Sequence, residues 1–430
     1  MKNTKYPFFL SRSSLLMIGL ILSLLLLSGY ELFLGDHEQQ KSNETIFKLP
    51  IDQWTYIEVD NQRGKWGDWD EPAWLRYFGL DMKDITGDGY KDIVAGRYFY
   101  RNPGGEMTSE WERIDLGMNV DGMLFVEVDG EGFGNIIATA LPDVYWLEAQ
   151  DEQGNSWKGI KIGEIPATSH VNGQGYGKAQ IVPGGKEEVL LATGEGIYYF
   201  EIPENTPEKG NWPVVHAAPE ASDEGFGIGD IDGDGLLDIV AGRRTGEEEG
   251  GGMDICWWKN PGNGEGNWQL YELGSTTYDA DRIEVADING NGKADVVVTE
   301  ERYPGKEPDA SLYWFERPDD PTQTNWKQHK VVTQYSMNNL DVADMDGDGH
   351  PDIITAEHKG ENLEVQIWIN NGKGNFSINV VDTGKESHLG SRVADLNGNG
   401  ALDIVSIGWD RHEYLHVWRN DGSASETIGE

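Results

Sequence analysis

Short apolar runs alternate with polar, glycine-rich turns from about residue 51 to residue 425. In a typical unit, an acidic loop is followed by an apolar run such as 353–355, and a second run ending in an aromatic residue follows after another turn. Runs of this length, rich in Val and Ile and bounded by Gly, Asp and Asn, are typical of β-strands. Each unit has room for four of them, so the sequence predicts an all-β protein.

One acidic loop marks each unit and has the pattern D-x-[D/N/T]-G-[D/N]-G-x-x-D. Complete copies begin at residues 84, 230, 287, 344 and 395, and degenerate copies begin at Glu127 and Gln180. The starts are 43 to 57 residues apart, which fits one four-stranded propeller blade per repeat. Seven repeats therefore predict one seven-bladed β-propeller over residues 51–425.

Aromatic residues mark the third and fourth strands. The third strand ends, in chain order, in Tyr100, Trp146, Tyr199, Trp258, Trp314, Trp368 and Trp418. The fourth opens in six units with Trp111, Trp157, Trp212, Trp268, Trp326 and Phe376, and the last unit lacks it. Residues 54–59 have the fourth-strand pattern but no unit of their own. We expect them to complete blade seven, because ring closure pairs an otherwise open sheet edge.

The N-terminal segment has the pattern of an export signal. Lys2, Lys5 and Arg12 precede an apolar run at residues 15–27. Residues 1–35 are therefore expected to be either a cleaved signal peptide or an uncleaved anchor, with the anchor at 13–34. Both alternatives export the rest of the chain to the periplasm, the cell surface or the medium. Residues 36–50 are polar and predict a linker.

The charge and the cysteine content limit the partners and the source of stability. A net charge of −41 argues against nucleic acid, because no basic face is available to release phosphate counterions. Membrane contact is expected only through the N-terminal segment, and a monomer is the default. The single cysteine, Cys256, excludes an intramolecular disulfide, and its apolar neighbours predict a buried thiol.

The acidic loops are candidate calcium sites. Ca²⁺ takes six to eight oxygen ligands, and positions 1, 3, 5 and 9 of the loop offer side-chain oxygens. Asp-Gly and Asn-Gly hairpins also form without metal, but four carboxylates in one hairpin repel each other unless a cation neutralises them. About five structural Ca²⁺ sites are predicted, one for each complete loop. Their ligands are Asp84, Thr86, Asp88, Asp92, Asp230, Asp232, Asp234, Asp238, Asp287, Asn289, Asn291, Asp295, Asp344, Asp346, Asp348, Asp352, Asp395, Asn397, Asn399 and Asp403.

These loops, repeated seven times over residues 51–421, resemble the FG-GAP/VCBS-repeat propellers related to integrin α-subunit heads. The resemblance implies the propeller fold and bound calcium. Similar propellers serve as adhesion modules, lectins, polysaccharide lyases and sugar dehydratases, so the resemblance leaves the function open. The loops at Glu127 and Gln180 depart from the pattern, and calcium is in doubt there.

The face opposite the acidic loops is rich in polar residues, Arg76 among them, and predicts a ligand pocket at the axial mouth. Elimination on a uronic acid or ketose needs a base, a group that stabilises the enolate, and an acid. His388 and His358 are the candidate bases, with His170 behind them. The candidate anion stabilisers are Arg392, Arg282 and Asn339, and the candidate acids are Tyr278 and Tyr335.

Two classes of function therefore remain open from the sequence. The leading hypothesis is an exported carbohydrate-active lyase or dehydratase that acts on a sugar or a uronic-acid-containing saccharide. The alternative is a non-catalytic, calcium-dependent module that binds glycan or protein. The acidity of the chain repels an anionic polysaccharide at long range, whereas local arginines attract it at the mouth, so a neutral sugar is equally compatible.

Overall fold

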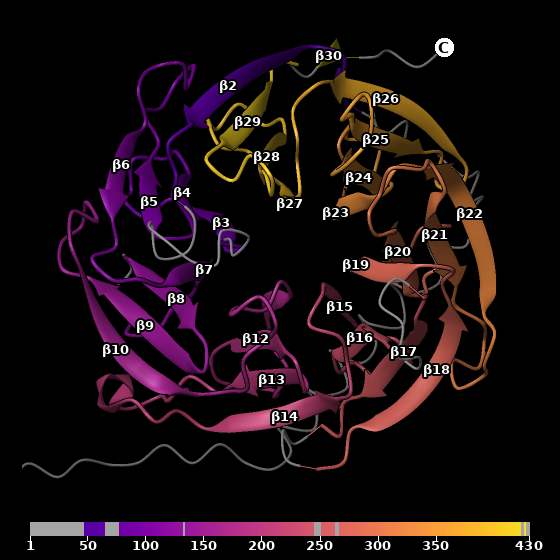
Figure 1. The fold of residues 1–430 in the computed structure, drawn as a ribbon, viewed down its shortest axis with the longest axis horizontal. Coiled ribbons are helices and arrows are strands. Elements are labelled where there is room, and N and C mark those ends of the chain that lie inside the picture. Colours follow the sequence, from indigo (N-terminus) through magenta and orange to yellow (C-terminus); the bar gives the residue numbers. More distant parts are fainter. Residues whose placement is uncertain are drawn as a thin grey trace, which may run out of the picture. The chain divides into compact units, whose positions relative to one another are not determined.

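The computed structural model describes residues 47–64, 77–131, 134–244, 251–262, 266–422 and 425–426. Seven four-stranded antiparallel sheets are arranged in a ring within this part of the chain (Figure 1). The signal or anchor call at 1–35, most of the linker call at 36–50, and Arg76 lie outside the described residues. Among the described residues, no helix has the length and apolarity needed to cross a bilayer.

Each blade is a meander of consecutive strands, as the repeat pattern predicts. Blades one to three contain β3 (Leu80–Lys83), β4 (Asp92–Ala95), β5 (Tyr98–Arg101), β6 (Glu112–Asp115); β7 (Asp121–Phe125), β8 (Asn135–Ala140), β9 (Asp143–Ala149), β10 (Trp157–Glu164); and β11 (Tyr176–Ala179), β12 (Glu188–Thr193), β13 (Gly196–Phe200), β14 (Val214–Pro219). Blades four to six contain β15 (Phe226–Gly229), β16 (Asp238–Arg243), β17 (Asp254–Lys259), β18 (Gln269–Ser275); β19 (Asp279–Ala286), β20 (Asp295–Glu301), β21 (Ala310–Glu316), β22 (Lys327–Gln334); and β23 (Met337–Ala343), β24 (Asp352–Glu357), β25 (Val365–Asn370), β26 (Phe376–Asp382).

Blade seven takes its outer strand from the beginning of the propeller. Its strands are β27 (Leu389–Ala394), β28 (Asp403–Ile407), β29 (Leu415–Asn420) and β2 (Trp54–Asp60). β2 pairs antiparallel with β29 from Trp54 opposite Asn420 to Asp60 opposite Leu415, and Figure 1 shows the indigo β2 lying beside the yellow β29. This confirms the predicted ring closure. A short pair of β1 (Phe47–Lys48) and β30 (Ser425–Glu426) joins the two ends as well.

The core lies between neighbouring blades, because both faces of each sheet are covered. The second strand is buried along its whole length in β4, β24 and β28. Apolar side chains from adjacent blades form shared clusters, such as Ile57, Val417 and Leu415 of blade seven with Phe78 and Tyr100 of blade one. Cys256 is buried in one such cluster, as predicted, and burial raises the pKa of its thiol to about 12.

The strand register differs in three blades from the aromatic pattern read from the sequence. Trp258, Trp368 and Trp418 stand opposite the residue that follows the last loop aspartate, as expected. At the same place, blades two, three and five have Leu147, Phe200 and Phe315, each one residue after the predicted Trp146, Tyr199 or Trp314. Strands buried on both faces carry adjacent apolar residues, so the pattern alone does not set the register.

Side chains at the end of the third strand connect neighbouring blades. Asn102, Asn260 and Asn370 donate their side-chain amide to the carbonyls of Leu396, Ile181 and Ile288, at 3.0, 2.8 and 2.7 Å. Each acceptor is the second residue of the loop of the preceding blade. The loops are therefore held to each other around the ring by direct hydrogen bonds as well as by apolar packing.

A candidate polar pocket at the axial mouth and seven unequal loops

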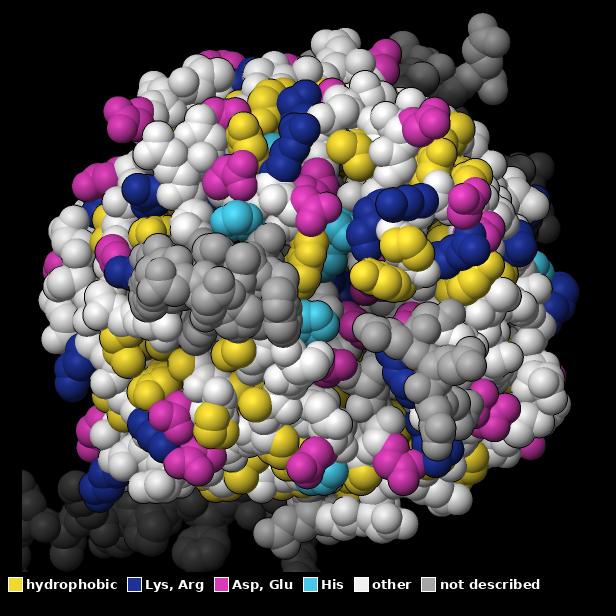
Figure 2. Space-filling model, viewed as in Figure 1, with side chains coloured by type: hydrophobic (Ala, Val, Ile, Leu, Met, Phe, Trp, Pro, Cys, Tyr) yellow, Lys and Arg dark blue, Asp and Glu magenta, His cyan; other side chains and the backbone are white. Residues whose placement is uncertain are grey.

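The connections between blades and the loops between second and third strands share one face of the ring, which we call the mouth face. A pocket of 490 Å³ lies on it over blades five to seven, lined by Pro304, Gly305, Lys306, Tyr335, His358, Lys359, Gly360, Glu361, Leu363, Glu386, Asp410 and Arg411. In the view of Figure 2, histidine and acidic side chains gather around the centre of the ring. The pocket therefore lies where the sequence predicted polar chemistry.

A histidine and a carboxylate form the inner part of this pocket. His358 Nδ1 lies 3.1 Å from Glu386 Oε1, and their side chains are only 1% and 5% exposed. Glu386 also accepts the backbone N–H groups of Trp409, Asp410 and Arg411, at 3.0, 2.9 and 2.8 Å. Burial by itself raises the pKa of Glu386, but His358 and these N–H groups outweigh it and hold the pKa below its ordinary value. Glu386 is therefore ionised, and its charge lies beside one ring nitrogen of His358.

The second candidate base, His388, lies directly behind His358. Their ring centroids are 4.3 Å apart in an edge-on arrangement, and His388 also contacts the ring of Trp409 at 4.9 Å. Burial, followed by the charges of His358 and Arg282, lowers the pKa of His388 well below its ordinary value. His170 lies on the other side of Trp409, 5.7 Å between centroids. The structure thus brings the three predicted histidines close together, with His358 against His388, and with His388 and His170 against Trp409.

Arg282 lies in a separate acidic network nearer the axis. Its Nη1 is 3.3 Å from Asp281 Oδ2 and 3.5 Å from Glu224 Oε2, and Asn338 donates to Asp281 at 3.1 Å. Burial raises the pKa of Asp281 to about 7, and burial together with Asp281 raises the pKa of Glu224 well above its ordinary value. Arg282 is therefore engaged by protein carboxylates and does not line the 490 Å³ pocket.

The other two predicted anion stabilisers also lie outside that pocket. Asn339 is fully buried and donates its amide to Ser387 Oγ at 2.8 Å. Arg392 lies deeper, in a cavity lined by inner strands, 3.9 Å from Glu284 and over the ring of Tyr176 at 5.5 Å. Burial raises the pKa of Glu284 to about 8. These residues hold inner strands together around the axis.

The cations that do line the pocket are Lys306, Lys359 and Arg411. Lys306, Lys359 and the carboxylate Glu386 were not identified from the sequence. Lys359 pairs with Glu301 at 2.8 Å. Tyr335, named from the sequence as a candidate acid, lines the same pocket. The sequence feature that could have pointed to Glu386 as a site residue is its position two residues before His388, in a polar segment that enters an inner strand.

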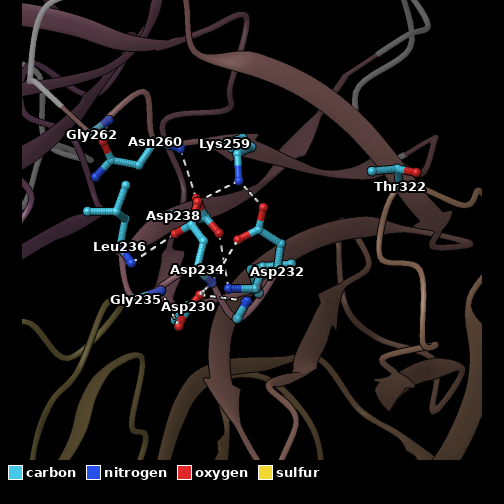
Figure 3. Close-up of polar contacts among 12 residues, drawn as sticks. Asp230, Asp232, Asp234, Gly235, Leu236, Asp238, Lys259, Asn260, Gly262 and Thr322 are labelled. Atoms are coloured by element: carbon cyan, nitrogen blue, oxygen red, sulfur yellow. Dashed lines mark hydrogen bonds and ion pairs between the residues drawn. The ribbon is translucent and has the colours of Figure 1, made fainter.

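The acidic loops share one backbone geometry. In blade four, Asp230 accepts the N–H groups of Gly233 and Gly235 at 2.8 and 2.9 Å, so the first carboxylate folds the loop around itself (Figure 3). The ninth residue, Asp238, accepts the N–H groups of Ile231 and Asn260 at 3.0 and 2.8 Å. A carboxylate oxygen keeps a further lone pair after one such bond.

Two loops bring three carboxylates close enough to share an ion. Oxygens of Asp344, Asp346 and Asp348 all lie within 4.8 Å of one another, and so do oxygens of Asp230, Asp232 and Asp238. Hard oxygen donors at this spacing suit Ca²⁺, and the loop at 344 meets the chemistry expected of positions 1, 3 and 5. The loops at 84, 287 and 395 replace one or two of these carboxylates by Thr or Asn.

The degenerate loops are closed by protein groups. In blade three, Gln180 Nε2 donates to the carbonyls of Val182, Gly184 and Lys186, at 2.6, 2.9 and 3.3 Å. The side-chain amide of Gln180 thus bonds three backbone carbonyls of its own loop. In blade two, Asp129 accepts the N–H of Glu131 at 3.1 Å and the amide of Asn135 at 3.2 Å.

Comparison with solved structures places the fold. BBS1N in complex with ARL6DN, soaked with mercury, is 11% identical, with 85% of this chain and 97% of that chain covered and a TM-score of 0.50. The same complex soaked with lead is 12% identical, with 89% and 99% covered and a TM-score of 0.49. A lectin from Agrocybe aegerita, described as recognising non-reducing terminal N-acetylglucosamine, is 18% identical, with 84% and 88% covered and a TM-score of 0.48.

Sequence comparison adds the nature of the repeats. No curated protein matches the chain. One family model, described as an FG-GAP-like repeat, matches residues 230–298 and 344–406. These ranges begin at the first aspartates of the loops of blades four and six and end within the second strand of the next blade, β20 or β28. The chain is thus a seven-bladed β-propeller that has FG-GAP-like repeats in two places, residues 230–298 and 344–406.

Proposed function

We propose that this propeller is an exported carbohydrate-active enzyme that performs an elimination on a saccharide in the 490 Å³ pocket of the mouth face. The observation that carries the proposal is the contact of His358 Nδ1 with Glu386 at 3.1 Å inside that pocket. A carboxylate next to one ring nitrogen of a histidine leaves the other ring nitrogen available as a base, which suits proton abstraction.

In the proposed reaction, the substrate carbon next to a carboxylate or carbonyl faces His358. Nε2 of His358 takes the proton, and the carbon–oxygen bond on the neighbouring carbon breaks, so the products are an unsaturated sugar and a free hydroxyl. The ammonium groups of Lys306 and Lys359 and the guanidinium of Arg411 line the same pocket and favour the enolate charge. His388 remains neutral beside His358, because its pKa is strongly lowered.

Tyr335 is the proposed acid. Burial and the neighbouring carboxylates of Glu361, Glu357 and Glu307 raise the pKa of its hydroxyl, so it carries a proton at neutral pH. Gly360 lies against its ring, and a Cβ at that position would come within 2.6 Å of the ring. The position of Tyr335 in the pocket therefore depends on a glycine from the loop after β24.

The pocket is open to a saccharide chain. Tyr303, next to the pocket residues 304–306, is 71% exposed, and Lys359 Nζ lies 5.6 Å from its ring centre. An exposed aromatic ring at the rim of a polar pocket provides a face on which a sugar ring stacks. This supports an oligosaccharide with one residue in the pocket and its neighbour over Tyr303.

The test is incubation of the purified chain with a panel of uronate-containing and neutral oligosaccharides. The expected result is ultraviolet absorbance from a conjugated unsaturated product, with loss of the signal in His358→Ala and Tyr335→Phe. His216→Ala is the matched control, because His216 lies on β14, the outer strand of blade three, and stacks there on Tyr198 of β13. Glycan binding without turnover in every variant would favour the binding module instead and overturn the enzyme.

Export is a separate part of the proposal and rests on the N-terminal pattern. Fractionation of cells that produce the full chain, with an antibody to the propeller, is the direct check. Recovery of all the protein in the cytoplasm would contradict it. N-terminal sequencing of the exported protein distinguishes the cleaved signal from the anchor at 13–34.

A further inference from the structure

Two of the acidic loops have the same ligand pattern but different surroundings. The loops at Asp230 and at Asp344 both read D-x-D-G-D-G-x-x-D. In both loops the N–H of the sixth residue also bonds the first carboxylate at 2.9 Å. A difference in cation binding between them therefore does not come from the residue types at the four ligand positions.

The carboxylates converge differently. In blade six, Asp344, Asp346 and Asp348, at positions 1, 3 and 5, lie within 4.8 Å of one another. In blade four the cluster contains positions 1, 3 and 9, and the fifth residue, Asp234, is not part of it.

Asp234 is engaged by a lysine instead. Lys259 Nζ lies 2.6 Å from Asp234 Oδ2 and also contacts Asp232 Oδ2, as Figure 3 shows. The ammonium group of Lys259 therefore bridges positions 3 and 5 of the loop.

The equivalent position in blade six carries no charge. Lys259 precedes Asn260, and Ile369 precedes Asn370; both asparagines donate their N–H to the ninth aspartate of their own loop, at 2.8 Å. In blades one and seven the position is an arginine that turns elsewhere. Arg101 bonds Asn155 at 2.9 Å, and Arg419 bonds Asp421 at 2.6 Å.

We propose that Lys259 is an internal cation that competes with Ca²⁺ for the blade-four loop, so that this loop binds calcium more weakly than the blade-six loop of the same pattern. Before Ca²⁺ can bind Asp234, the ion pair between Asp234 and Lys259 must break. An ammonium group that remains nearby also repels the ion. This competition concerns only the predicted Ca²⁺ site of the blade-four loop and is independent of the proposed elimination.

The experiment is calorimetric titration of the calcium-free full chain with CaCl₂, with bound calcium counted by elemental analysis after dialysis. Lys259→Met keeps the apolar stem and removes the charge, and it is expected to raise the affinity of one site by about tenfold or more. Lys293→Met is the matched control, because Lys293 belongs to the blade-five loop but pairs with Asp319 at its exposed edge. It is expected to leave the affinity of the blade-four loop unchanged.

The reciprocal variant keeps the test decisive if Lys259→Met folds poorly. Ile369→Lys places an ammonium beside the blade-six loop and is expected to weaken one tight site by about tenfold. Unchanged affinity and stoichiometry in both Lys259→Met and Ile369→Lys would overturn the proposal, as would an equal gain in Lys293→Met. Absence of calcium binding in every variant would overturn the calcium sites themselves along with it.

Discussion

The imidazole of His358 lies 3.1 Å from the carboxylate of Glu386, and both side chains are almost completely buried beside an open pocket. Glu386→Gln keeps the size of the side chain and removes its charge. We expect it to lower turnover by about 10- to 100-fold, because the histidine loses the charged partner that positions it. His358→Ala is expected to cost about 100-fold or more.

Steady-state kinetics on the best oligosaccharide of the panel provide the measurement, and circular dichroism of both variants checks that they remain folded. Full activity in Glu386→Gln would contradict the positioning role of Glu386.

Removal of calcium is expected to lower the melting temperature of the propeller. The crowded carboxylates of Asp344, Asp346 and Asp348 repel each other without a cation, and an ion that binds only the folded state stabilises it by mass action. Scanning calorimetry with excess EDTA, with excess Ca²⁺ and with Asp348→Asn gives the comparison. A melt that is identical with EDTA and with calcium, and no metal by elemental analysis, would contradict the prediction.

Carboxylates buried around the axis predict that the propeller becomes less stable as the pH rises toward about 8. Burial raises the pKa of Asp121 and of Asp281 to about 7 and that of Glu284 to about 8, whereas the same groups in the unfolded chain titrate near about 4. The folded state therefore holds more protons between these values, and the free energy of unfolding falls as the pH rises through this window. Histidine side chains change the free energy of unfolding in the opposite direction, but only below about pH 6.5, where the histidines of the unfolded chain are protonated.

Urea unfolding at several pH values between about 6.5 and 8.5, with calcium held constant, measures this slope. Glu284→Gln removes the group with the highest of the three pKa values and is expected to flatten the upper part of the curve. A free energy of unfolding that rises with pH over this range in the wild type would be inconsistent with the buried carboxylates.

The ring closure predicts a large effect from one side chain of the first strand. Ile57 is 7% exposed and packs with Val417 and Leu415 of blade seven and with residues of blade one. Ile57→Ala is expected to lower the free energy of unfolding by about 2 to 5 kcal/mol. Val214→Ala, on an exposed position of β14, is the control and is expected to change it little. Equal effects of the two variants would mean that β2 does not bear on the stability of the ring.

Sequence reasoning reached the fold because the repeat is explicit. Gly and Asp recur at fixed positions of the five complete loops, and the extra strand at 54–59 could pair only with the incomplete last blade. The same reasoning placed Arg392 at the mouth, whereas it lies one layer deeper, because the strand register decides how far along the axis a side chain sits. Glu386 and Lys259 were not identified from the sequence, because both contact residues that are distant in sequence.

The borrowed outer strand also bears on how the protein is made. β2 is synthesised before the other strands of blade seven, and its partner β29 ends at Asn420. A nascent propeller therefore carries an unpaired strand at residues 54–60 until residues 415–420 have been made. A product that stops before residue 415 would leave blade seven without its third strand, and β2 would have no partner to close the ring.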